Sequence, residues 1–383
     1  MNNELDGYTI YAHNLGRFDS IFILKSLILN SEFKLTPIWK DTGILSITIQ
    51  YGKIKVNLLD SLQLIKGNLD SILSSFNCKA QKGHFPYSFV NKDNIYSVGD
   101  KPSQSFYKNI SDLDYSKIPN KNWDLKKETL SYLKSDLVGL LEAILKFNDT
   151  IFRRYKLNIT RFKTLPSLAL GVYTSNYMPE GLGIKMIKGE IEKEIRSSYY
   201  GGNVEVYVNE ISEGYYYDMN SQYPRAMLND MPVGNPKLSL ETNLENIFGF
   251  IYGEINCPNE STLQVPFIQC KDPNTNLNIC PRGKFKRLIF SEEIKYALKY
   301  GYTIDVEYSY IFERGIDLFK DFVTDHYEIK KLSIDSVQKT TAKLFLNALY
   351  GRMGMKDIDS TIEIISLDEA SELEKRSNVT IFS

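Results

Sequence analysis

The sequence predicts an α+β protein in which strands and helices are mixed along the chain. Residues 44–60 (ILSITIQYGKIKVNLLD) alternate apolar and polar side chains on both sides of Tyr51-Gly52, which is typical of a hairpin. Residues 126–148 repeat leucines at three- and four-residue spacing, which is typical of an amphipathic helix. With 383 residues, 43% of them apolar, the chain is long enough for two to three domains of roughly 150 residues.

The first 150 residues are expected to form one α+β domain around this hairpin and this helix. Residues 86–124 are polar and rich in proline, so they are expected to form a long surface excursion. The remaining expected elements are a strand at 8–12, a turn at 13–18, a helix at 19–29 and a short helix at 68–76 capped by Asn68.

The second part of the chain follows a break that we place near 150–200. A basic stretch from Lys146 to Lys163 carries six cations against Asp149 alone, so it is either a solvated helix face or a patch that faces phosphates. The expected elements beyond it are strands at 203–217, 246–256 and 302–312 and helices at 291–300 and 319–349.

Charge, cysteine content and hydropathy exclude several classes of protein. Lys and Arg number 46 against 47 Asp and Glu, which excludes a uniformly basic nucleic-acid coat but is compatible with a local basic channel. The four cysteines have no C-x-x-C spacing, so neither a disulfide scaffold nor a standard zinc site is expected, and a reducing compartment fits. No run reaches the roughly 18 apolar residues of a membrane span, so no membrane partner is expected.

The first motif with chemical content is H-N-L-G-R-F-D at 13–19. Asp19 stands at a strand-to-helix turn, where a carboxylate can bind a metal while Asn14 and Phe18 hold a base or a sugar. The alternative is an ordinary turn, because Asn and Asp are common turn residues.

The second motif is Y-L-K-S-D at 132–136. On a helix, Tyr132 and Asp136 share a face, so the phenol can orient a water bound to a metal that Asp136 holds. The alternative is a solvated helix face.

The third motif is Y-D-M-N-S-Q-Y-P at 217–224. Asp218 is expected at the end of an aromatic strand, before a tight turn into a helix. This position suits Mg²⁺, which takes one or two carboxylates and completes its shell with substrate phosphates. The carbonyl of Met219 offers a further ligand, and Tyr223 would lie beside a nucleotide sugar. The alternative is an aspartate that caps a helix.

The fourth motif is K-L-F-L-N-A-L-Y-G-R at 343–352. Lys339, Lys343, Asn347 and Tyr350 are spaced by four, four and three residues, so they share one helix face. Two ammonium groups one turn apart favour an anion between them, such as a triphosphate. The alternative is an amphipathic helix with exposed lysines.

Taken together, these motifs resemble those of the family B DNA polymerases. D-x-x-S-x-Y-P at 218–224 is similar to motif A, and K-x-x-x-N-A-x-Y-G at 343–351 is similar to motif B with Ala348 in place of serine. N-L-G-R-F-D and Y-x-x-x-D are similar to the second and third exonuclease motifs.

Three further elements resemble the protein-primed branch of that family. Tyr199-Tyr200-Gly201-Gly202 is similar to Y-x-G-G, Ser61-Leu62-Gln63-Leu64-Ile65 to the S/T-L element, and Lys82-Gly83-His84-Phe85 to the K-x-x-hydrophobic element. Seven elements in the family order resemble most the polymerases of linear mitochondrial plasmids, which are primed by a terminal protein.

The resemblance implies a ribonuclease-H-like 3′–5′ exonuclease domain at 1–150, a basic linker at 151–200, and palm and fingers at 201–383 with an insertion at about 240–315. It implies DNA synthesis on a primer-template from dNTPs with Mg²⁺, or Mn²⁺ in its place. It also implies a terminal protein primer and a mitochondrial location.

The same resemblance implies a role for each matching residue. The metal ligands would be Asp218, Met219, Asp19 and Asp136, with Asp218, Asp19, Asp136 and Tyr132 as the catalytic set. The nucleotide would contact Tyr223, Lys331, Lys339, Lys343, Asn347 and Tyr350. DNA would contact Asn14, Phe18, Ser61, Leu62, Lys82, Tyr199, Gly201, Gly202 and Gly351.

Two motifs of the family are not found. The D-x-E exonuclease motif is not found before Asn14, and Asp357-Ile358-Asp359 follows Gly351 too soon to be motif C. We therefore expect a fragment of an active polymerase, a degenerate and catalytically inactive remnant, or a non-catalytic DNA-binding protein with strongly salt-dependent binding.

Overall fold

A computed structural model describes residues 3–30, 32–40, 43–80, 83–183, 185–356 and 367–373. The chain forms two compact units: unit 1 is Met1–Tyr177 with Thr324–Ser383, and unit 2 is Met178–Val323. The mixed helix-and-strand class predicted from the sequence is confirmed. The units group residues by packing, so the predicted functional domains 1–150, 151–200 and 201–383 stay predictions.

Unit 1 contains a four-stranded sheet in the order β1-β4-β3-β2. Its strands are β1 (Thr9–Ala12), β2 (Phe33–Lys40), β3 (Gly43–Tyr51) and β4 (Ile54–Asp60). β1 runs parallel to β4, and the predicted hairpin is the antiparallel pair β3–β4. β2 is absent from the sequence prediction, since Pro37 interrupts the strand-like pattern of its residues. Proline lacks a backbone N–H to donate, and it is tolerated here because β2 is an edge strand.

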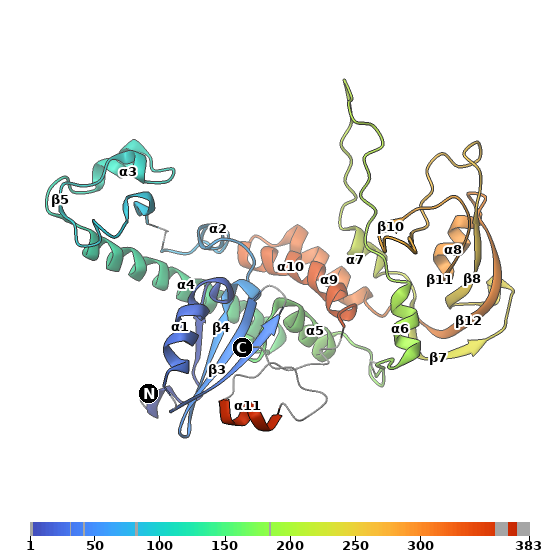
Figure 1. The fold of residues 1–383 in the computed structure, drawn as a ribbon, viewed down its shortest axis with the longest axis horizontal. Coiled ribbons are helices and arrows are strands. Elements are labelled where there is room, and N and C mark those ends of the chain that lie inside the picture. The colour runs from blue at the N-terminus through green and yellow to red at the C-terminus, as the bar shows by residue number, and fades with distance from the viewer. Residues whose placement is uncertain are drawn as a thin grey trace. The chain divides into compact units, whose positions relative to one another are not determined.

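The helix predicted at 19–29 is α1 (Asp19–Ile28), which lies beside the sheet (Figure 1). Its Leu24 packs into a core with Leu35 and Ile47 of the sheet. The helix predicted at 68–76 is α2 (Leu69–Ser75), and Asn68 caps it by accepting the Ser71 N–H at 2.8 Å. Both short elements therefore match their local sequence signals.

The other helices of unit 1 are longer or more numerous than predicted. α4 (Leu125–Tyr155) extends seven residues beyond the predicted end at 148. The 86–124 excursion is largely irregular, as predicted, but holds the strand pair β5–β6 and an unpredicted helix whose Ser111 accepts the Asp114 N–H. The bounds are α3 (Asp112–Lys117), α5 (Leu165–Asn176), α11 (Leu367–Leu373), β5 (Val98–Gly99) and β6 (Trp123–Asp124).

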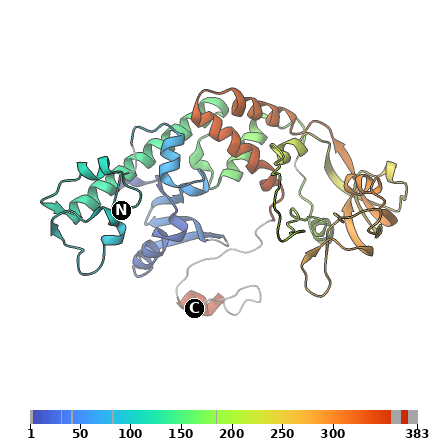
Figure 2. The ribbon, with the colours of Figure 1, turned by 90° about the horizontal axis from the view of Figure 1, so that it is seen from above.

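The prediction of a single helix at 319–349 is wrong in one respect, because the structure contains two helices there. α9 (Lys320–Leu332) begins in unit 2 and ends in unit 1, and α10 (Ser336–Met353) lies in unit 1. Asp335 breaks the run because its side chain accepts the Val337 and Gln338 N–H groups and so starts a new helix. α10 runs beside α5 in both views (Figures 1 and 2).

Unit 2 contains an antiparallel sheet in the order β11-β8-β12-β7. α8 packs on one face through Ile294 against Ile251 and Ile255. Ile195 of α6 packs near Phe250, and successive residues of β8 point to opposite faces, so α6 lies on the other side. The bounds are α6 (Glu190–Ser197), α7 (Gln222–Ala226), α8 (Ser291–Leu298), β7 (Met231–Ser239), β8 (Gly249–Cys257), β9 (Cys270–Lys271), β10 (Asn278–Ile279), β11 (Gly283–Phe290) and β12 (Thr303–Gly315).

The elements predicted at 246–256, 291–300 and 302–312 are confirmed as β8, α8 and β12, whereas the strand predicted at 203–217 is wrong. These residues form the 203–217 loop, which extends from the neighbourhood of α7 away from the sheet of unit 2 (Figure 1). Val204 and Tyr216 are 93% and 95% exposed. An apolar alternation predicts a strand only where a neighbouring strand supplies hydrogen bonds, and the described residues supply none here.

Within the part of the chain that the structure describes, no helix is both long and apolar enough to cross a lipid bilayer.

Candidate nucleic-acid and nucleotide interface

The N-L-G-R-F-D loop of unit 1 is held by a carboxylate that lies outside the motif. Asp60, 2% exposed at the end of β4, accepts the backbone N–H groups of Asn14 at 2.9 Å, Gly16 at 3.3 Å and Leu62 at 3.0 Å. We call this arrangement the Asp60 clamp. It joins the predicted exonuclease loop to the S-L element, two segments that the sequence separates by more than 40 residues.

Close backbone packing and a histidine strengthen the same junction. A Cβ at Gly16 would collide with the carbonyl oxygen of Ile44, so only glycine fits there without rearrangement. His13 contacts Ser61 Oγ at 3.0 Å and the carbonyl oxygen of Gly67 at 2.9 Å. Ser61 is 1% exposed, so its hydroxyl supports the loop from inside and has almost no surface for direct contact with DNA.

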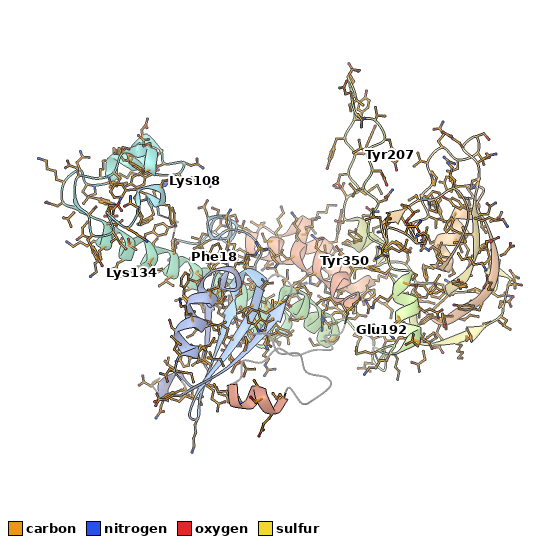
Figure 3. The ribbon with its side chains drawn as sticks, in the orientation of Figure 1. Phe18, Lys108, Lys134, Glu192, Tyr207 and Tyr350 are labelled. Atoms are coloured by element: carbon orange, nitrogen blue, oxygen red, sulfur yellow. The ribbon has the colours of Figure 1, made fainter. Side chains whose placement is uncertain are left out.

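By contrast, Phe18 is exposed at the start of α1 (Figure 3). Asp19, the first residue of α1, is also exposed. Phe18 is 61% exposed. An exposed aromatic ring at this position can stack on an unpaired base.

The K-x-x-hydrophobic and Y-x-x-x-D elements also come together. Phe85 and Tyr87 pack on Tyr132 with ring centroids 5.3 and 5.9 Å away, and Tyr87 donates a hydrogen bond to the Tyr132 hydroxyl at 2.9 Å. Burial, the bond to Tyr87 and the nearby Asp136 carboxylate all raise the pKa of Tyr132. Its phenol therefore stays protonated. Lys82 lies outside the described residues.

Glu142 is a residue that sequence reasoning missed. Its carboxylate accepts the N–H groups of Lys79 at 2.9 Å and Ala80 at 3.2 Å, and it pairs with Lys146 at 3.0 Å. These bonds lower its pKa to about 2. Glu142 thereby ties the segment before Gln81 to α4, and the Glu142/Lys146 spacing of four residues was the visible signal for the ion pair.

The basic stretch at 146–163 is largely engaged within unit 1. Lys146 donates to the carbonyl of Asn77 at 2.6 Å, Arg153 pairs with Asp149 at 2.8 Å, and Arg154 pairs with Asp325 of α9. These contacts favour a structural role for these three cations over a patch that faces phosphates.

The polar face predicted for the fourth motif is present on α10. Lys339, Lys343 and Asn347 are exposed, and Gly351 follows them at the surface. Tyr350 on the same helix is half-buried (Figure 3). The opposite face is buried and consists of Val337, Thr341, Ala342, Phe345, Leu346, Ala348 and Leu349. Lys331 is exposed near the end of α9.

The motif A segment of unit 2 is open to solvent. Asp218 is exposed directly after the 203–217 loop, Met219 is 72% exposed and Tyr223 is 55% exposed. Ser221 adopts a left-handed conformation with φ of 53°, and the chain then enters α7. The turn into a short helix that the sequence predicted is therefore present.

The Y-x-G-G element is likewise exposed at Tyr199, Gly201 and Gly202. Apart from the adjacent residues of the chain, no described atom lies within 4 Å of a Cβ added at either glycine, so a ligand can approach the backbone closely.

Comparison with known proteins decides the family. The family described as "DNA polymerase type B, organellar and viral" matches residues 1–382. A relative named "Probable DNA polymerase" from Agaricus bitorquis is 40% identical over 394 residues, covering 99% of this chain and 49% of the relative. The chain belongs to the organellar and viral type B DNA polymerases.

Other members of the family match over nearly the whole chain. A "Probable DNA polymerase" from Podospora anserina is 31% identical over 425 residues, covering 97% of this chain and 35% of the relative. The chain thus spans about half of the Agaricus relative and about a third of the Podospora one.

Solved structures of Phi29 DNA polymerase share the fold. Its orthorhombic crystal form matches with a TM-score of 0.63 at 22% identity, over 91% of this chain and 60% of that chain. Its ternary complex with primer-template DNA and incoming nucleotide substrates matches with a TM-score of 0.62 at 23% identity, over 90% and 59%.

The candidate metal ligands of this family member do not form a complete site in the described residues. Among them, no three His, Cys, Asp or Glu side chains gather into a group that would hold a metal. The exposed carboxylate of Asp218 fits one Mg²⁺ that takes its other ligands from phosphates and water. It does not by itself fit a site for two ions.

Proposed function

We propose that this family member acts in DNA-directed DNA synthesis of the protein-primed type. In this reaction a primer 3′-hydroxyl attacks the α-phosphate of a dNTP in line, pyrophosphate leaves, and the template selects the base. The partners are a DNA primer-template, dNTPs and a terminal protein that supplies the priming hydroxyl.

The observation that carries this proposal is the exposed face of α10. Lys339 and Lys343 stand one turn apart, and like charges at this spacing destabilise a helix unless an anion lies between them. The triphosphate of a dNTP is such an anion, and charge-assisted hydrogen bonds to its oxygens are strong. Lys331 adds a third cation, while Asn347, Tyr350 and Gly351 contact the nascent base pair and the template.

Asp218 and the Met219 carbonyl are proposed ligands of the metal, Mg²⁺ or in its place Mn²⁺. When bound, a divalent ion neutralises phosphate charge and aligns the reacting oxygens. Tyr223 lies beside the sugar and excludes a 2′-hydroxyl by crowding. Tyr199, Gly201 and Gly202 contact template phosphates.

A 3′–5′ exonuclease function is proposed for unit 1. Asp19 and Asp136 are the metal ligands, and Tyr132 orients the attacking water. Because its pKa is raised, the Tyr132 phenol acts by hydrogen bonding and not as a base. Asn14, Phe18 and Leu62 hold the frayed 3′ end, and Ser61 supports them from inside.

The organellar description of the family supports a mitochondrial location. A second candidate function is DNA binding without catalysis. It is favoured by the absence, among the described residues, of any group of three His, Cys, Asp or Glu side chains that could hold a metal.

Primer extension on a templated DNA hairpin, first with Mg²⁺ and then with Mn²⁺, tests the proposal. We expect extension that Asp218→Ala abolishes. We expect Lys343→Ala to weaken dNTP binding by about ten-fold, as loss of one charge-assisted phosphate contact predicts. Lys126→Ala, which removes an exposed lysine from the start of α4, is the matched control.

Binding of DNA and dNTP without extension would support the second candidate. Failure to bind DNA would overturn both functions, whereas binding of DNA without binding of dNTP would leave only the second candidate.

A further inference from the structure

The Y-x-G-G element is held by residues that lie about 70 to 90 positions further along the chain. Tyr200 and Gly201 contact Arg287 of β11 and Gln269, which immediately precedes β9. All four residues belong to unit 2. Neither Arg287 nor Gln269 is part of a motif, so the sequence offered no signal for either.

Arg287 is the centre of this arrangement and is only 7% exposed. Its guanidinium lies 4.5 Å from the centroid of the Tyr200 ring and donates to the carbonyl oxygens of Gln269 and, at 3.0 Å, of Leu288. Glu293 lies 3.6 Å away and balances the charge. Although burial lowers its pKa, an arginine stays charged at neutral pH. A buried planar cation can therefore stack on Tyr200 and anchor Gln269 at once.

Gln269 extends this anchor to the glycines. Its side-chain amide donates to the carbonyl oxygen of Gly201 at 2.9 Å. The described peptide bonds are all trans, and in a trans peptide the N–H of the next residue points opposite to the carbonyl. The N–H of Gly202 therefore points away from Gln269. Gly202 is exposed, and the position that a Cβ would occupy is open.

We propose that Arg287 and Gln269 are positioning residues that aim the Gly202 N–H at a DNA phosphate oxygen. Backbone N–H groups are common phosphate donors in protein–DNA complexes. Arg287 does not touch the DNA: it stacks on Tyr200 and holds the Gln269 backbone, and Gln269 orients the peptide between the two glycines. This inference rests on the proposed function of Y-x-G-G in DNA binding.

Three variants and one control test the inference. Arg287→Lys keeps the charge but loses the planar stack, Arg287→Gln loses both, and Gln269→Leu removes only the donor to Gly201. Lys286→Gln is the matched control, since the neighbouring strand residue points to the other face and pairs with Glu307.

The first measurement is made without DNA. Chymotrypsin cleavage after Tyr200 is compared by mass spectrometry with cleavage after the exposed Tyr207 in the same molecules. We expect the ratio to rise about five-fold in Arg287→Lys, Arg287→Gln and Gln269→Leu, because proteolysis follows local opening, and to stay unchanged in Lys286→Gln. An unchanged ratio in all three variants would overturn the positioning role.

The second measurement is the affinity for a primer-template across a series of salt concentrations. We expect each of the three variants to weaken binding about ten-fold, as loss of one bond to a charged group predicts. The salt slope should stay unchanged, because a neutral N–H releases no counterion. We also expect Arg287→Lys with Gln269→Leu to be no weaker than either change alone.

A different pattern would overturn the proposal. If Arg287→Lys binds DNA as the parent does while Arg287→Gln lowers the salt slope by about 0.9, Arg287 is a direct phosphate contact. If the cleavage ratio rises while affinity is unchanged, the anchored segment does not serve DNA binding. If the parent protein binds no DNA, the proposed function fails, and the cleavage ratio still decides the anchoring.

Discussion

The Asp60 clamp and the 203–217 loop are two regions where a family motif follows a strand-like run, and they differ in what holds them. Asp60 is buried and binds three backbone N–H groups that belong to two separate motifs. Val204, Tyr216 and Tyr217, which precede Asp218, are more than 85% exposed. The difference shows that a motif acquires a defined geometry from buried partners outside it.

We expect the greatest loss of stability from removal of the Asp60 clamp. Asp60→Ala leaves three partly buried N–H groups without their acceptor, so we expect a loss of about 3 kcal/mol in the free energy of unfolding. Urea unfolding followed by circular dichroism measures it. Asp70→Ala, an exposed carboxylate on α2, is the control and should change stability little. Equal stability of the two variants would show that the clamp does not hold the loop.

A smaller effect is expected from the backbone contact beside the clamp. Gly16→Ala places a methyl group against the Ile44 carbonyl, and we expect a loss of about 2 kcal/mol, as for other overpacked sites. Gly99→Ala has open space around its Cβ and is the matched control. A melting temperature that falls equally in both variants would contradict the close approach at Gly16.

Glu142 is another carboxylate that accepts backbone N–H groups, and its contribution to the free energy of unfolding should depend on pH. Because its pKa is lowered from 4.5 to about 2, its stabilising contribution is complete above pH 4.5 and is lost as pH falls toward 2. Unfolding measured from pH 6 to pH 2 should therefore show a smaller acid-induced loss in Glu142→Gln than in the parent. Asp149→Asn removes an exposed ion pair from the same helix and should leave the pH profile unchanged.

The smallest effect is expected in the 203–217 loop. Val206 is 77% exposed, so Val206→Thr should change the free energy of unfolding by less than about 0.5 kcal/mol. Val56→Thr, at a 1% exposed position in β4, is the contrasting variant and should be clearly destabilising. A marked loss in Val206→Thr would mean that the loop is packed in solution.

The elements that the sequence predicted well have local causes. The β3–β4 hairpin, the cap of α2 by Asn68 and the polar face of α10 each depend on residues within a few positions of one another. The missed strands β7 and β11 lack a clear alternation and exist because β12 and β8 pair with them. The strand predicted at 203–217 failed for the converse reason, since its alternation has no partner among the described residues.

The features of the candidate site also fall into two groups, those with local causes and those that depend on contacts between distant residues. The motifs that identified the family, and the face shared by Lys339, Lys343 and Asn347, follow from the sequence because helix periodicity and motif spacing are local properties. Only the tertiary structure decided that Asp60 joins the exonuclease loop to the S-L element, that Ser61 is buried, and that Arg287 and Gln269 hold the Y-x-G-G element. These contacts join residues tens of positions apart, and burial and hydrogen bonding at such distances depend on how the chain packs.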